Sequence, residues 1–83
     1  MAWFDIIWNY EDEDGNVEHV AHHDLTPEDV NEVLENPIRE EISESSGRPI
    51  AFGYTPDGRL IAVVYEEIDD CTLYPVTAYV IEE

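Results

Sequence analysis

The chain has 83 residues, of which 21 are acidic and only three are basic, so its formal charge is −18. A surface this negative repels nucleic acid and anionic lipid, and it attracts cations or a basic protein. With 43% hydrophobic residues the chain can still build a core, so we expect one folded domain over residues 1–83.

The composition also limits cofactors and location. The single Cys71 excludes an intrachain disulfide and a cysteine zinc cluster. The sequence contains no glycine-rich phosphate loop and no nucleophile elbow, so we expect no cofactor. Residues 1–5 lack the positive charge and apolar run of a signal peptide, and no stretch approaches the roughly 18 apolar residues of a membrane span. We therefore expect a cytoplasmic protein with no membrane partner.

The first part of the chain predicts a strand and then a short helix. Residues 3–10 are aromatic and β-branched, which is the composition of a strand. An acidic run over residues 11–14 and a Gly-Asn turn follow. Apolar residues then recur at helical spacing, which predicts a short helix over residues 17–23.

The next segment predicts a second helix with defined ends. Thr26 is expected to cap it, and Pro27 occupies its first position. Leu25, just before the cap, is expected to pack on Val30 as in a hydrophobic staple. The Asn-Pro pair at residues 36–37 ends the helix.

Four strands are predicted after the helices, over residues 38–43, 49–54, 60–66 and 72–81. The Pro-Asp-Gly turn at residues 56–58 joins two of them into a hairpin. The nearly continuous apolar run at residues 60–64 predicts a central strand covered on both faces. Pro75 predicts an edge position or a bulge. The expected fold is α+β, with order β-α-α-β-β-β-β and two short helices on one face of a mainly antiparallel four- to five-stranded sheet.

The histidines form a group in the sequence. His19, His22 and His23 are spaced so that a helix would place them on one side, where two imidazoles can hold a transition metal. A near-neutral pKa also suits imidazole to acid–base chemistry. Surface or packing roles are the simpler interpretation, and we expect no metal site.

Arg39, Arg48 and Arg59 are the only arginines, and the chain has no lysine. Among so many carboxylates, each arginine is most simply a partner in a surface ion pair. A phosphate-binding site would require several of them to converge.

Three stretches together resemble the BrnT-type ribonucleases, a small bacterial family of toxin–antitoxin proteins, and related domains of unknown function. Residues 23–30 (HDLTPEDV) resemble the family's His-Gly-Val-Ser/Thr-x-Glu-Glu-Ala connection between two helices. Residues 48–53 resemble its Arg-Phe-x-x-x-Gly strand, and residues 57–65 resemble its central hairpin. The resemblance implies a RelE-like α+β fold.

The resemblance also implies candidate catalytic residues for an endoribonuclease, namely His23, Arg48 and Arg59. Other basic positions of the family are lost. His22 stands where Lys or Arg is usual, and residues 76–79 (VTAY) replace a strand that normally ends in arginine. No basic helix follows in this sequence, which ends in two glutamates. Because RNA cleavage needs cations to hold phosphates and to stabilise oxyanion charge, we expect the ribonuclease activity to be lost.

The sequence therefore favours a non-catalytic interaction protein on a toxin-like fold, with a basic protein as partner and no nucleic acid. One alternative is an active ribonuclease toxin of a type II toxin–antitoxin pair. Another is an acidic mimic of nucleic acid, with carboxylates spaced like phosphates. Halophile-like adaptation also explains the composition without any special partner, and the oligomeric state is not predicted.

Overall fold

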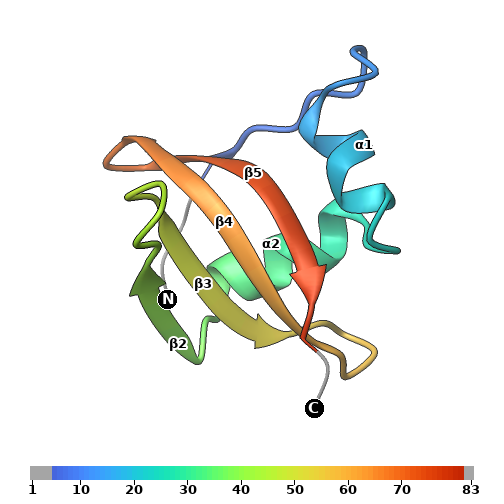
Figure 1. Cartoon of the computed structure of the whole chain (residues 1–83). Coiled ribbons are helices and arrows are strands. Elements are labelled where there is room, and N and C mark those ends of the chain that lie inside the picture. Colours follow the sequence, from blue (N-terminus) through green and yellow to red (C-terminus); the bar gives the residue numbers. More distant parts are fainter. Residues whose placement is uncertain (1–4, 82–83) are drawn as a thin grey trace.

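A five-stranded sheet packs against two helices in the computed structural model, which describes residues 5–81 (Figure 1). The elements are β1 (Asp5–Ile6), α1 (Asn16–Ala21), α2 (Pro27–Glu35), β2 (Arg39–Ile42), β3 (Pro49–Tyr54), β4 (Leu60–Asp69) and β5 (Thr72–Val80). This order confirms the predicted α+β class and the sequence of elements. In the described part of the chain, neither helix is long and apolar enough to cross a membrane.

The strands lie in the order β1-β5-β4-β3-β2. All neighbours are antiparallel except β1, which pairs parallel to β5. Strand β1 is shorter than predicted, and residues 3–4 of the predicted strand lie outside the described residues. Beyond Ile7 the chain leaves the sheet because its backbone bonds to the side chain of Asn16. The Ile7 carbonyl accepts a hydrogen bond from the Asn16 amide nitrogen, and the Asn9 N–H donates to the Asn16 amide oxygen.

Helix α2 forms where the sequence predicts it, and its ends have clear causes. The Thr26 hydroxyl accepts from the Asp29 N–H, and the Asp29 carboxylate accepts from the Thr26 N–H. This reciprocal pair satisfies two backbone donors that would otherwise lack partners at the start of the helix. Leu25 and Val30 are both buried in the core, as expected for the predicted staple.

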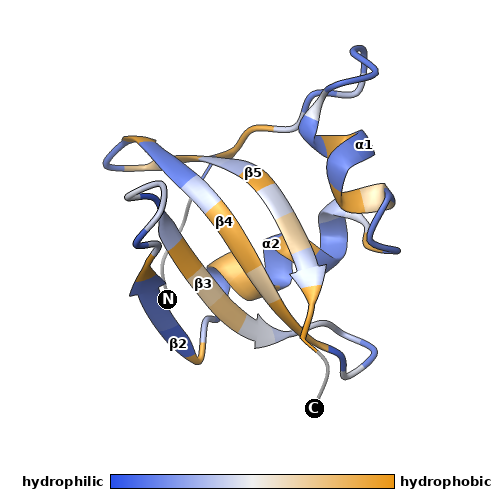
Figure 2. Cartoon of the chain, in the orientation of Figure 1, coloured by the Kyte–Doolittle hydropathy of each residue, from blue (hydrophilic) through white to orange (hydrophobic). Residues whose placement is uncertain are grey.

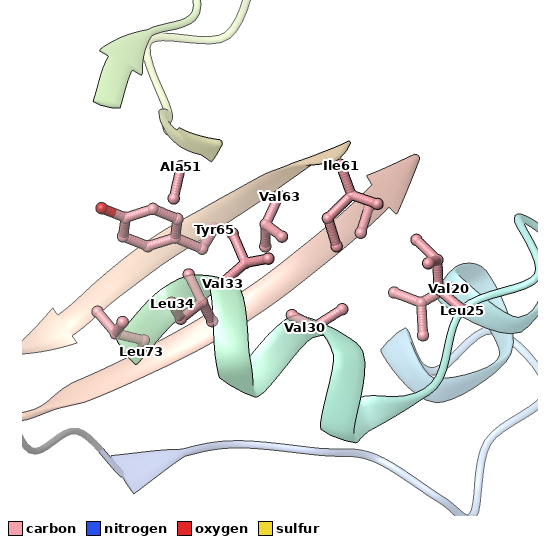
Figure 3. Packing of buried hydrophobic residues seen from close by; sticks show 11 residues of the cluster. Val20, Leu25, Val30, Val33, Leu34, Ala51, Ile61, Val63, Tyr65 and Leu73 are labelled. Carbon is pink, nitrogen blue, oxygen red and sulfur yellow. The ribbon is translucent and has the colours of Figure 1, made fainter. Parts of the chain in front are cut away.

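The core lies between α2 and the sheet (Figure 3). Val30 and Val33 of α2 are fully buried, and so are Ile61 and Val63 of β4. Burying each side chain of this size contributes about 1.5–3 kcal/mol. Gly53 of β3 allows the close approach of the two layers, because a Cβ there would lie only 3.2 Å from Cγ1 of Val33.

Helix α1 packs beside β5 and is anchored by its first residue (Figure 1). Asn16 is only 2% exposed, and its side-chain amide donates to the carbonyls of Ile7 and Pro75 at 2.8 and 2.9 Å. The side-chain oxygen of Asn16 accepts a hydrogen bond from the Asn9 N–H at 2.7 Å. One buried amide therefore ties the N-terminal segment, α1 and β5 together.

Pro75 lies at a bulge, which is one of the two positions that the sequence predicts for it, the other being an edge strand. The β4–β5 register shifts so that Tyr65 faces Pro75 while Val64 faces Thr77, which leaves Val76 as the extra residue. The proline ring cannot donate to the ladder, and a bulge is a position that tolerates this loss.

Strand β4 is central, between β3 and β5, but the prediction that both of its faces are covered is wrong. Helix α2 lies behind the sheet in Figure 1, α1 lies beside β5, and neither helix covers the front of the sheet. Apolar residues on the other side are shielded by their neighbours within the sheet: Ala62 is 0% exposed and lies in register between Phe52 and Tyr79. A continuous apolar run therefore did not require a second layer.

Tyr65 carries the one phenol of the core, and it reaches a carboxylate at the edge of the sheet. The side chain is 5% exposed, and its hydroxyl donates to Oε1 of Glu40 at 3.0 Å. Burial, together with this hydrogen bond to Glu40, raises the pKa of Tyr65 to about 12. The folded state thus keeps the phenol protonated at pH values where the unfolded chain loses the proton.

Replacing Asn16 with alanine should lower the free energy of unfolding by about 2–4 kcal/mol, because buried backbone groups would lose their partners. Urea denaturation checks this value. Asn36→Ala, at an exposed helix end, is the control and should change the stability by less than about 0.5 kcal/mol. Equal losses in the two variants would contradict the anchoring role of Asn16.

The Tyr65 phenol should make the protein lose stability as the pH rises from its ordinary pKa of 10.0 to about 12. In that window the unfolded state releases the proton and the folded state retains it, so unfolding is favoured. Chemical denaturation across this pH range measures the effect. Tyr65→Phe should flatten this part of the profile, and an unchanged profile would contradict the assignment.

Candidate functional site

Arg59 lies at the centre of an ion cluster where the β3–β4 turn meets the start of α2. Its guanidinium contacts Asp57 at 3.0 Å, Asp29 at 3.2 Å and Asp24 at 3.9 Å. It also donates to the Asp24 carbonyl at 2.8 Å. We call these four residues, Asp24, Asp29, Asp57 and Arg59, the Arg59 cluster.

The Arg59 cluster shifts the titration of its members. Hydrogen bonds from Thr55 and then from Arg59 hold the pKa of Asp57 below its usual value. The hydrogen bond to Asp57 and the charges of the three carboxylates raise the pKa of Arg59. Arg59 therefore links the β3–β4 turn to the segment that precedes α2, and its guanidinium is shared by three carboxylates.

The other two arginines are paired on the sheet. Arg48 Nε contacts Oε1 of Glu66 at 2.8 Å. Arg39 pairs with Glu41, and its guanidinium carbon lies 5.7 Å from the centre of the Phe52 ring, within the range of a cation–π interaction. Every arginine of the chain thus has a carboxylate partner, as the sequence suggested.

The candidate catalytic residues His23, Arg48 and Arg59 do not form one site. Arg59 donates a hydrogen bond to the carbonyl of Asp24, the neighbour of His23. His23 and Arg59 therefore lie near the same end of β4. Arg48 binds Glu66 toward the other end of that strand. Glu66 lies six residues after Leu60, the first residue of β4, which is roughly 20 Å along the strand at about 3.3 Å per residue, so the two arginines lie near different parts of β4. A single phosphate cannot bridge them.

The three histidines differ in their surroundings. Helix α1 ends at Ala21, two residues earlier than predicted, so His22 is its C-cap and His23 lies in the following turn. Nδ1 of His19 lies 3.3 Å from the carbonyl of Val76. Within residues 5–81, no group of three His, Cys, Asp or Glu side chains is arranged to hold a metal ion.

The sheet surface opposite the helices forms what we call the open face. Its members point away from α2 by the alternation of side chains along each strand, and they are Arg39, Glu41, Ile50, Phe52, Tyr54, Leu60, Ala62, Val64, Glu66, Tyr74, Thr77 and Tyr79. Two rows cross all four antiparallel strands, Arg39–Phe52–Ala62–Tyr79 and Glu41–Ile50–Val64–Thr77. No described element packs on these rows (Figure 1).

The open face combines an apolar centre with paired charges. Figure 2 shows a hydrophilic β2 beside the more hydrophobic β3 and β4. Tyr54 is 51% exposed and Tyr79 is 39% exposed. Its two carboxylates, Glu41 and Glu66, each pair with an arginine of the same side of the sheet. The two carboxylates among these members are therefore matched by Arg39 and by Arg48, which directly precedes β3.

The outer surface of α2 has the opposite character. Glu28, Glu32 and Glu35 are exposed at helical spacing, and the last turn contains no basic residue. None of the three forms an ion pair with an arginine, because the arginines pair with five other carboxylates. The two layers thus present an acidic surface on one side and a neutral, apolar surface on the other.

Reasoning from the sequence missed the open face and the role of Asn16. Ile50, Phe52 and Tyr54 alternate with smaller residues along one strand, which is a signal for the open face. Only the pairing of the strands shows which side of the sheet is left uncovered. No local pattern marks Asn16, because its partners Ile7 and Pro75 are distant in sequence.

Comparisons of the chain with known protein families, with curated proteins and with solved structures found no match. The site must therefore be interpreted from its own geometry.

Replacing Arg59 with glutamine should destabilise the protein more than Arg39→Gln does, because three carboxylates would face one another without a cation. The lowered pKa of Asp57 means that this stabilisation is present at neutral pH and is lost as the pH falls through that pKa. Denaturation midpoints at neutral pH and below pH 4 measure both effects. Arg39 is a suitable control because its side chain is 67% exposed. Equal losses of stability in the two variants at neutral pH would contradict a stabilising role for the Arg59 cluster.

Proposed function

We propose that the chain is a non-catalytic interaction protein that binds a basic protein partner. The observation that carries the proposal is the distribution of charge: all three arginines are paired within the chain, while the outer carboxylates of α2 have no arginine partner. The surface is thus available to cations and unsuited to phosphates.

The geometry of the arginines supports the absence of ribonuclease activity. A ribonuclease must stabilise negative charge that develops on the phosphate, and it does so with cations or donors aimed at one point. Here Arg59 is surrounded by three aspartates, and Arg48 lies at the other end of the β3–β4 hairpin. An incoming phosphate would have to displace carboxylates that are already in place.

The resemblance to BrnT-type toxins stays a prediction, and one backbone feature agrees with it. Asp24 occupies the position where the family's connection between helices carries glycine. Its φ is +61°, in the left-handed region that favours glycine. We infer that a toxin-like scaffold has kept its connection and lost its basic surface.

The proposal predicts that the immobilised chain captures a basic protein from extracts of its host at low salt and releases it at high salt, because exposed charges are screened. Glu28→Gln, Glu32→Gln and Glu35→Gln combined should weaken this capture about tenfold or more. Quantitative mass spectrometry of the captured proteins measures the loss.

A second triple variant is the matched control. Glu11→Gln, Asp12→Asn and Glu13→Gln remove the same charge from the acidic turn before α1 and should leave capture nearly unchanged. Equal effects of both variants would mean that attraction is nonspecific. Cleavage of RNA by the purified chain, abolished by His23→Ala, would contradict the non-catalytic assignment.

A further inference from the structure

The open face has the chemistry of a buried surface although no described element covers it. Ile50, Phe52, Leu60 and Val64 are only partly buried, and Tyr54 and Tyr79 are exposed. Contiguous apolar surface of this kind marks a site of association in soluble proteins. The charges around it indicate which partner it fits.

The arginines are distributed unevenly between the two sides of the molecule. The chain has three arginines for 21 carboxylates, and two of these arginines neutralise the carboxylates of the open face. A basic partner would gain most from carboxylates that lack a cation, whereas Glu41 and Glu66, the carboxylates named among the members of the open face, each already have one. This face therefore suits a partner that approaches without excess positive charge.

We propose that the open face binds the open face of a second copy of this chain. Two molecules of charge −18 repel each other wherever carboxylates without a cation face one another. The carboxylates Glu41 and Glu66 of the open face are paired with arginines, so two open faces can come together with less repulsion than other surfaces. A two-fold axis would place the same surface on both sides, so the sheets would stack about 10 Å apart as in a β-sandwich.

The area available sets the expected strength of this dimer. Four strands about 4.8 Å apart, with about six residues at 3.3 Å along the longer ones, give a footprint of at most about 400 Å² per copy before the relief of the side chains is counted. Two copies together would bury about 800 Å², which is less than the about 1,000 Å² that a stable interface needs, so we expect a weak, transient dimer that forms only at high protein concentration. Repulsion between the two acidic bodies opposes the contact, and salt should strengthen it by screening.

This dimer does not depend on the proposed function, because it uses the opposite side of the sheet from α2. The salt dependence separates the two: capture of a basic partner weakens as salt rises, whereas self-association strengthens. The chain could therefore fail to capture a basic partner and still form dimers, or capture a partner and stay monomeric.

Sedimentation equilibrium at about 0.1 M and about 1 M NaCl tests the proposal. The wild-type chain should form dimers at high salt and dissociate more readily at low salt. Tyr79→Glu and Tyr54→Glu each place an unpaired carboxylate on the open face and should raise the dissociation constant about tenfold or more. Both positions are exposed, and circular dichroism verifies that the two variants fold.

Tyr10→Glu is the matched control, because it makes the same chemical change at a residue that is 71% exposed and lies outside the sheet. It should leave the dissociation constant unchanged. A wild-type chain that stays monomeric at high salt and about millimolar concentration would overturn the proposal. Dimers weakened equally by Tyr10→Glu and Tyr79→Glu would also overturn it.

Discussion

Two short helices can cover only one face of a five-stranded sheet, and the rest of the structure depends on this limit. Val30 and Val33 of α2 pack over Ile61 and Val63 of β4, which fixes the side that carries the core. The same strand pairing leaves Phe52 and Tyr79 on the other side. A domain of this size buries only about 60% of its unfolded surface, so a large uncovered face is an expected consequence of the fold.

The few arginines are placed where carboxylates would otherwise be most costly. Arg59 joins the β3–β4 turn to the connection before α2, and Arg39 and Arg48 balance the two glutamates of the open face. The remaining described carboxylates lie where water and salt can solvate them. This allocation explains how a chain of charge −18 can keep both a core and an apolar sheet surface.

Local signals predicted most of the fold. Thr26 and Pro27 determine the start of α2 through short-range hydrogen bonds and the fixed backbone angle of proline, and the Pro-Asp-Gly turn determines the β3–β4 hairpin. Long-range contacts were not predictable. Neither the short parallel β1, nor the Asn16 anchor, nor the uncovered side of β4 has a local signature, because each depends on partners far along the chain. For the site, ion pairing of the arginines could be predicted from composition, but their separation could not.

The two sides of the sheet differ in charge and polarity, and the proposed self-association uses the open face alone. Amide chemical shifts recorded in a dilution series at high salt test it most directly, because they report each residue separately. If the open faces associate, the amide shifts of β3, β4 and the C-terminal half of β5 should depend on concentration, and those of α2 should stay unchanged. Shifts centred on α2, or no dependence on concentration in any strand, would contradict it.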